Sequence, residues 1–214
     1  APEAEFQHLG VGLFNLKEKF IYLVEREIEN AKNGLPAKMI LKMNNLEQKD
    51  MIELLYRAND SGVETQLIIR SVCSILTGKP GLSDNIHGLS ILDRFLEHSR
   101  IFYFFNNGEE EIFISSADWM ERNLHFRVET LIPIYDPQIK EIFKTLLQIQ
   151  LQDNVKARSL DYGKVNEYKT SDYDLAVRSQ VETYYYIKRM TETFYAKKTE
   201  EKKKSRSPKS QSNN

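Results

Sequence analysis

Helical and strand-like segments alternate along the first 70 residues, and this alternation constrains the fold more than any other feature of the sequence. Apolar residues recur on one helical face over 13–28, and a short apolar run follows at 38–43. A second helix is predicted over 48–59, before a further strand at 64–70. Elements of these lengths favour a parallel sheet with right-handed crossovers. We therefore predict an α/β domain whose sheet is flanked by helices.

A β-hairpin is predicted in the middle of the chain. An apolar, aromatic strand at 101–105 runs into the turn Asn106-Asn107-Gly108, and the chain returns as a second strand at 111–114. Asparagine and glycine adopt positive φ at low cost, which a tight turn between antiparallel strands requires. Because these strands reverse direction, the predicted sheet is mixed rather than purely parallel.

Polar residues cluster at the open end of this hairpin. His98 precedes its first strand, Ser115 and Ser116 end its second, and Asp118 follows two residues later. Because the strands are antiparallel, these residues meet at one edge of the sheet, where an imidazole beside hydroxyls and a carboxylate can support acid–base chemistry. Ser116 and Asp118 also resemble the N-cap region of a helix, whose N-terminus would suit an anion. A purely structural role for His98 stays open.

Two further charged residues are candidates for binding or catalysis. Arg70 ends an apolar strand, where its guanidinium could hold a phosphate with two hydrogen bonds or pair with a surface carboxylate. Glu129 lies in an apolar run, where a buried carboxylate needs a partner such as a histidine; the alternative is a solvated strand face. The loop at 71–86 leaves the carboxyl end of a strand, and its amides around Cys73 could contact a phosphate.

Composition and motifs exclude several classes of protein. No apolar run in the 214 residues approaches the ~20 that a membrane span needs, and no signal peptide is recognised. The single cysteine, Cys73, excludes an internal disulfide and a cysteine-rich zinc site. The segments Gly-x-x-x-x-Gly-Lys-Ser/Thr and Gly-x-Gly-x-x-Gly are absent, which argues against P-loop and Rossmann sites.

The remaining sequence predicts the domain organisation. We expect a strand at 128–134, helices at 139–151 and 175–194, a lead-in over 1–12, one α/β domain over 13–195 and a disordered basic tail over 196–214. The tail carries seven Lys or Arg and two Glu but almost no apolar residues, so it cannot bury enough surface to offset its ordering entropy. Because the chain opens on Ala1 without an initiator methionine, we expect a piece of a longer polypeptide.

Taken together, several sequence blocks resemble the C-terminal domain of bacterial polyphosphate kinase. They follow the family's order through nearly all of residues 5–190 and are specific at this length. The blocks are F-N-L (14–16), L-K-M-N-N-L (41–46), I-I-R-S-V-C-S (68–74), G-L-S-D-N-I (81–86), R-F-L-E-H-S-R (94–100), I-S-S-A-D-W-M-E-R-N (114–123) and Q-L-Q-D-N-V-K-A-R (150–158).

The resemblance implies a fold and roles for individual residues. The fold would be one half of a phospholipase-D-like pair, with a mixed sheet flanked by helices. His98 matches the family's second essential histidine, Arg70 an arginine on the nucleotide phosphates, and Glu129 a buried acid near the histidines. Arg100, Ser116 and Asp118 complete the substrate-binding set that we predict from the same segments.

The resemblance also implies substrates and partners. The enzyme would move the terminal phosphate of ATP reversibly onto inorganic polyphosphate, through a phosphohistidine in the preceding half. Mg²⁺ would arrive with ATP rather than on dedicated ligands of this segment. We expect the remaining domains of the same polypeptide as partners, a homo-oligomer for the full enzyme, no nucleic acid, and a cytoplasmic location with or without peripheral membrane association.

Departures from family patterns bear on the alternatives. In polyphosphate kinases glycine commonly follows the phosphate-binding arginine, and here Ser71 replaces it. Compared with the phospholipase-D pattern His-x-Lys, Arg100 occupies the lysine position, Phe105 stands where an acid is expected, and Ser115-Ser116-Ala117-Asp118 replaces Gly-Ser-x-Asn. These differences argue against a phospholipase-D-type phosphodiesterase, while a non-catalytic module that binds polyanions through Arg70 and the basic tail remains a third interpretation.

Overall fold

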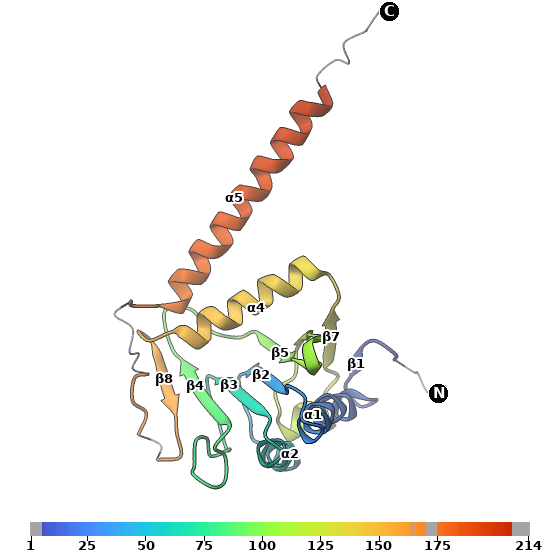
Figure 1. Cartoon of the computed structure of the whole chain (residues 1–214), viewed down its shortest axis with the longest axis vertical. Helices are drawn as coiled ribbons and strands as arrows, with labels where there is room; N and C mark the ends of the chain where they lie inside the picture. The colour runs from blue at the N-terminus through green and yellow to red at the C-terminus, as the bar shows by residue number, and fades with distance from the viewer. Residues whose placement is uncertain (1–5, 164, 170–174, 207–214) are drawn as a thin grey trace, which may run out of the picture.

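A mixed sheet of eight strands forms the centre of the computed structural model, which describes residues 6–163, 165–169 and 175–206 (Figure 1). Across the sheet the strand order is β1-β7-β6-β5-β2-β3-β4-β8. The strands are β1 (Gly10–Val11), β2 (Lys38–Met43), β3 (Glu64–Ile69), β4 (Ile86–Ile91), β5 (Arg100–Phe104), β6 (Glu111–Ser115), β7 (Thr130–Ile134) and β8 (Ala157–Leu160).

Helices cover both faces of this sheet. Figure 1 shows α1 (Leu16–Lys32) and α2 (Lys49–Asp60) on one face and α4 (Pro137–Gln152) on the other. The short helix α3 (Glu121–His125) follows β6, and the long helix α5 (Ser179–Arg206) projects away from the body.

The alternation of side chains along β2 shows how the sequence builds two cores. Met39, Leu41 and Met43 are buried in the cluster beneath α1 and α2, whereas Ile40 is buried in the second cluster beneath α4. Successive side chains of a strand point to opposite faces, so a central strand that is apolar on both sides belongs between two helical layers. The same alternation places Lys42 on the α4 face.

Strand pairing confirms the predicted α/β class with its mixed sheet. β2 pairs in parallel with β3, and β3 pairs in parallel with β4. On the other side, β5 runs antiparallel to β2, so that β5 begins at the edge where the parallel strands end. The loops and strand ends at this carboxyl edge are therefore where the predicted site residues gather.

The predicted hairpin is also confirmed. β5 pairs antiparallel with β6, and Arg100 lies opposite Ser115 at the open end. At the closed end Asn106, Asn107 and Gly108 have φ values of 46°, 51° and 98°, which are positive, as the turn chemistry predicts.

Several boundaries differ from those predicted. The lead-in contains β1, which pairs with β7, and α1 begins at Leu16 because Leu13 takes a φ of 67° outside the helix. The last helix, predicted over 175–194, spans Ser179–Arg206 in the structure. It therefore continues past residue 196, where we predicted the start of a disordered tail. Lysine and glutamate are strong helix formers, and a helix already nucleated continues without a buried face. The predicted tail residues 207–214 lie outside the described residues.

Gly12 is expected to tolerate no side chain. A Cβ at this position would lie 2.3 Å from the backbone oxygen of Arg127 and 2.6 Å from the backbone nitrogen of Glu129. We predict that Gly12→Ala lowers the unfolding free energy by about 1–3 kcal/mol or more, because rigid backbone must move. A thermal melt measures this loss against Gly163→Ala, where the Cβ comes within 3.0 Å of only the Asp161 side chain. Equal melting temperatures for the two variants would contradict the prediction.

Candidate active site

The centre of the candidate site is an ion pair between half-buried Arg100 and buried Asp118. Arg100 Nε donates to Asp118 Oδ1 at 3.1 Å, and Arg100 Nη2 donates to Asp118 Oδ2 at 3.2 Å. The side chains are 12% and 5% exposed. Two parallel hydrogen bonds of this kind fix the guanidinium plane as well as its position. Arg100 begins β5 and Asp118 follows β6, so the hairpin brings both to the same edge.

Two asparagines that follow β2 complete the surroundings of Asp118. The backbone N–H and Nδ2 of Asn44 donate to Asp118 Oδ1 at 2.8 and 3.1 Å, and Asn45 Nδ2 donates to Asp118 Oδ2 at 3.0 Å. Burial alone would raise the pKa of the Asp118 carboxyl, but the hydrogen bonds from Arg100 and the asparagines outweigh it and lower that pKa. The carboxylate is thus an internal anchor whose charge is compensated by the protein.

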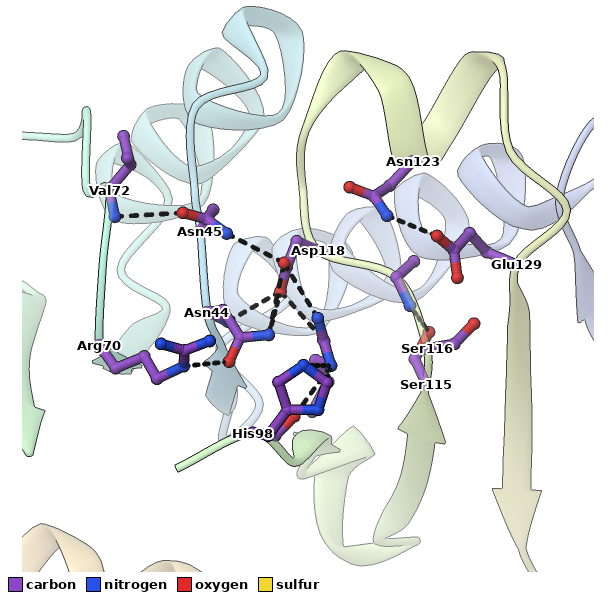
Figure 2. A network of polar contacts seen from close by, with 12 residues as sticks. Asn44, Asn45, Arg70, Val72, His98, Ser115, Ser116, Asp118, Asn123 and Glu129 are labelled. Atoms are coloured by element: carbon purple, nitrogen blue, oxygen red, sulfur yellow. Dashed lines mark hydrogen bonds and ion pairs between the residues drawn. The ribbon is translucent and has the colours of Figure 1, made fainter. Parts of the chain in front are cut away.

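Arg70 and His98 are each connected to Asp118 through one intervening residue, Asn44 for Arg70 and Arg100 for His98. Arg70, the residue after β3, donates through Nε to Asn44 Oδ1 at 2.6 Å. On the other side, Arg100 Nη1 donates to the backbone oxygen of His98 at 2.9 Å and lies 3.3 Å from both ring nitrogens. Figure 2 shows the resulting row from Arg70 through Asn44 and Asp118 to His98. His98 itself is exposed, and Arg70 is half-buried.

Glu129 lies in a separate part of the site. Its side chain is buried, at 8% exposure, and Oε1 accepts a 2.5 Å hydrogen bond from Asn123 Nδ2 in α3 (Figure 2). The alternative that Glu129 lies on a solvated strand face is therefore wrong. Among the described residues the partner of the carboxylate is this amide and not a histidine.

Ser116 does not cap a helix as predicted. α3 begins later, at Glu121, with Met120 as its N-cap. Instead, Ser116 Oγ accepts from the backbone N–H of Thr130 at 3.0 Å, and Ser115 Oγ donates to the backbone oxygen of Thr130 at 2.6 Å. Both hydroxyls therefore fasten the end of β6 to the neighbouring strand, β7.

The loop after Arg70 is also built differently from the prediction. The backbone amides of Ser71, Val72 and Ser74 donate to Asn44, Asn45 and Leu46. Since these donors are engaged within the fold, they are not free to hold a phosphate as expected. The asparagine pair after β2 organises both the loop and Asp118, and its only signal in the sequence is two polar residues directly after a buried strand.

A second ion pair, between buried Lys42 and half-buried Glu97, the residue before His98, was missed by the sequence analysis. Lys42 Nζ in β2 donates to Glu97 Oε2 at 3.1 Å, and the side chains are 3% and 13% exposed. Burial lowers the pKa of the Lys42 ammonium, against the opposing effect of Glu97. The two residues are 55 positions apart in the sequence. Local periodicity shows a lysine within an apolar strand and a glutamate beside a histidine, but it does not show that the two side chains form a pair.

The part of the chain that the structure describes contains neither a candidate metal-binding cluster nor a candidate membrane-spanning helix. No group of three or more His, Cys, Asp or Glu side chains there could hold a metal ion. Three carboxylates of the candidate site, those of Glu97, Asp118 and Glu129, are engaged by Lys42, Arg100 and Asn123 respectively, so the residues present do not fit a dedicated Mg²⁺ site. No helix among the described residues has the length and apolar character of a membrane span.

The fold defines a phospholipase-D-like domain. It is similar to Nuc from Salmonella typhimurium, a phospholipase D family member, with a TM-score of 0.51 and 13% identity over 72% of this chain and 96% of that chain. Identity this low shows the fold alone. Crystallised polyphosphate kinase from Porphyromonas gingivalis is far more similar, with a TM-score of 0.86 and 45% identity over 90% of this chain and 30% of that chain.

Sequence comparison then identifies the family. The model of the polyphosphate kinase C-terminal domain 2 matches residues 9–180, so the chain belongs to this family. The polyphosphate kinases of Vibrio vulnificus (strain YJ016) and Escherichia coli (strain K12) are 44% and 41% identical over 86% of this chain. The chain spans about a quarter of the length of these relatives, 26% and 27% respectively.

Proposed function

We propose that this chain is the C-terminal catalytic domain of a polyphosphate kinase that moves the terminal phosphate of ATP reversibly onto inorganic polyphosphate. The transfer would proceed through a phosphohistidine in the preceding half of the polypeptide. The observation that carries the proposal is the row Arg70–Asn44–Asp118–Arg100–His98, which places two guanidinium groups and an exposed imidazole at one edge of the sheet. Phosphoryl transfer depends on such positioning and charge stabilisation.

The two arginines would have different roles in binding phosphate. Among the described residues Arg70 donates only through Nε, so its two terminal nitrogens are free to hold phosphate oxygens. Arg100 is locked by Asp118 and presents Nη1 beside the His98 ring. We therefore assign Asp118 to positioning rather than to direct contact with substrate, because both of its carboxylate oxygens are engaged within the protein. Ser116 is exposed and, among the described residues, its hydroxyl only accepts from Thr130, so it would still donate to a phosphate oxygen as a substrate-binding residue.

His98 and Glu129 would carry the acid–base part of the mechanism. The exposed imidazole of His98 can donate or accept a proton, or stabilise charge, as the phosphoryl group moves. Glu129 uses one carboxylate oxygen for Asn123, which leaves the other to orient a histidine contributed by the preceding half.

The substrates and partners follow from the same proposal. ATP, ADP and polyphosphate would bind at this edge, with the remaining domains of the polypeptide closing the site, and the full enzyme would form a homo-oligomer. Mg²⁺ would enter on the ATP phosphates and neutralise part of their charge. The enzyme would be cytoplasmic, with or without peripheral membrane association. The Asp118-locked Arg100 in place of the lysine disfavours a phospholipase-D-type phosphodiesterase.

Labelling with γ-³²P-ATP tests the proposal. We expect phosphohistidine and labelled polyphosphate from the complete enzyme, and neither from this chain alone, because the phosphoacceptor lies outside it. Arg70→Ala should weaken ATP handling more than Arg70→Lys, since lysine keeps the charge but loses the two-pronged contact. Arg57→Ala on α2 is the matched control, because Arg57 is exposed and pairs with Glu25 away from the site.

Either of two results would overturn the assignment. Phosphohistidine formed on the isolated chain would move the acceptor into this domain. Wild-type kinetics for both Arg70 variants would make Arg70 a surface residue and remove the phosphate-binding edge from the proposal.

A further inference from the structure

The segment that carries His98 is held in place almost without apolar packing. Residues 92–99 leave β4, cross the carboxyl edge of the sheet and lead into β5. Three apolar side chains of this segment, Leu92, Phe95 and Leu96, are 61%, 67% and 69% exposed. Hydrophobic burial therefore contributes little to its position, and polar contacts must supply the anchoring.

One polar contact is the hydrogen bond from Arg100 to the backbone oxygen of His98, and several others come from residues at the start of α5. Arg178 Nε and Nη2 donate to the two carboxylate oxygens of Asp93 at 2.8 and 2.6 Å. The Gln180 amide pairs with the backbone of Phe95, accepting from its N–H at 2.9 Å and donating to its oxygen at 2.8 Å. Gln180 Nε2 also donates to Glu97 Oε1 at 2.9 Å. We call these contacts of Arg178 and Gln180 the α5 clamp.

Glu97 connects the clamp to the interior of the domain. While Oε1 accepts from Gln180, Oε2 accepts from Lys42 Nζ in β2 at 3.1 Å and from Gln150 Nε2 in α4 at 2.8 Å. The carboxylate thus joins a strand and two helices immediately before His98. A cavity of about 240 Å³ lies against Phe95, Glu97, Gln150 and Gln180. Because this space is not filled by side chains, the hydrogen bonds rather than close packing hold Glu97 in place.

The start of α5 is itself rigidly attached to the body. Fully buried Asp153, just after α4, accepts from the backbone N–H of Ser179 at 2.7 Å through Oδ2. Its other oxygen accepts from three consecutive amides of the chain entering β8, at residues 155–157. Because the clamp has a fixed base, it can hold the segment 92–99 in one position.

We propose that Arg178 and Gln180 are positioning residues for His98, acting through Asp93, Phe95 and Glu97. The inference rests on the proposed role of His98 in phosphate transfer, but the positioning itself does not depend on that role. In this arrangement the helix that projects from the body sets the place of the imidazole at the edge of the sheet. Loss of the clamp would misplace His98 while leaving Arg70 and the Arg100–Asp118 pair intact.

The first experiment measures positioning in this chain directly. Histidine labelled with ¹³C at Cε1 gives one NMR signal for each of the four histidines. We expect Gln180→Ala and, independently, Arg178→Ala to shift and broaden the His98 signal while the signals of His8, His87 and His125 stay in place. The control is Gln148→Ala, which removes an exposed glutamine of α4 and should move none of them.

The second experiment measures the consequence in the complete enzyme. Gln180→Ala should lower kcat roughly 10- to 100-fold, as expected for a catalytic group displaced by about 1 Å, with KM for ATP changed less than about two-fold. A His98 signal unmoved in both folded variants would overturn the positioning inference. A moved signal with unchanged kcat would keep the positioning and instead contradict the proposed role of His98.

Discussion

Replacing His98 by alanine in the complete enzyme is expected to slow phosphate transfer by about 10²–10⁴-fold, or about 3–5 kcal/mol of transition-state stabilisation. The physical reason is that, in the proposed mechanism, the exposed imidazole at the edge of the sheet would act on phosphate oxygens only while the phosphoryl group moves. Interactions that are stronger in the transition state than in the ground state change the rate and leave binding almost unaffected.

Single-turnover transfer and nucleotide binding, measured beside a melting curve, test this expectation. The fold should survive, because the His98 side chain is exposed and the buried run of β5 begins only at Ile101. His87→Ala is the matched control, since His87 is an exposed histidine of β4. An early-melting His98→Ala protein, or one that transfers phosphate at a near-normal rate, would return this histidine to a structural role.

Removing the Asp118 carboxylate is expected to cost about 3–5 kcal/mol of unfolding free energy, the usual loss when one partner of a buried ion pair is removed. Asp118→Ala leaves the Arg100 guanidinium buried without its counter-charge, and it leaves the donors of Asn44 and Asn45 unpaired. The loss should appear in chemical denaturation as a lower midpoint with an unchanged slope.

The same carboxylate predicts a dependence of stability on pH. Because the folded-state pKa of Asp118 is lowered, the stability that it contributes is fully present above the pKa of the unfolded chain. That pKa is about 3.9, so the contribution is lost as the pH falls from about 4 through the lower folded value. Asp118→Asn should therefore flatten the acid limb of the stability curve, and Asp60→Asn at the exposed end of α2 should not. Parallel acid limbs for the wild type and Asp118→Asn would refute this account.

Local patterns were sufficient to predict the centre of the fold. β2 was predicted with its observed bounds, and β3 and the β5–β6 hairpin to within one residue at each end. These elements combine apolar runs with strong turn residues, which act over a few neighbouring positions and can be recognised without knowing the tertiary structure. The edge that unites His98 with Asp118 follows from the same information, since a hairpin fixes which ends of its strands meet.

Strands that depend on distant partners were missed. β4 contains the polar and small residues His87, Gly88 and Ser90, and β8 is the short run Ala157–Leu160. Neither has a strong periodicity of its own. They form strands because β4 pairs with the edge of β3, and β8 pairs with the edge of β4, with Gly88 opposite Leu160. The intrinsic strand propensity of these residues is weak, so pairing with a neighbouring strand determines their secondary structure.

The α/β class, the family and the edge at which the candidate residues gather can all be predicted from the sequence, because local periodicity or contiguous blocks of residues encode each of them. The partners of the polar residues at that edge, in contrast, are known only from the folded structure. Asp118 accepts a hydrogen bond from Asn44, which is 74 positions away in the sequence, and Glu97 accepts one from Gln180, which is 83 positions away. A buried charge takes the partners that the fold brings to it, and those partners follow from packing rather than from spacing along the chain.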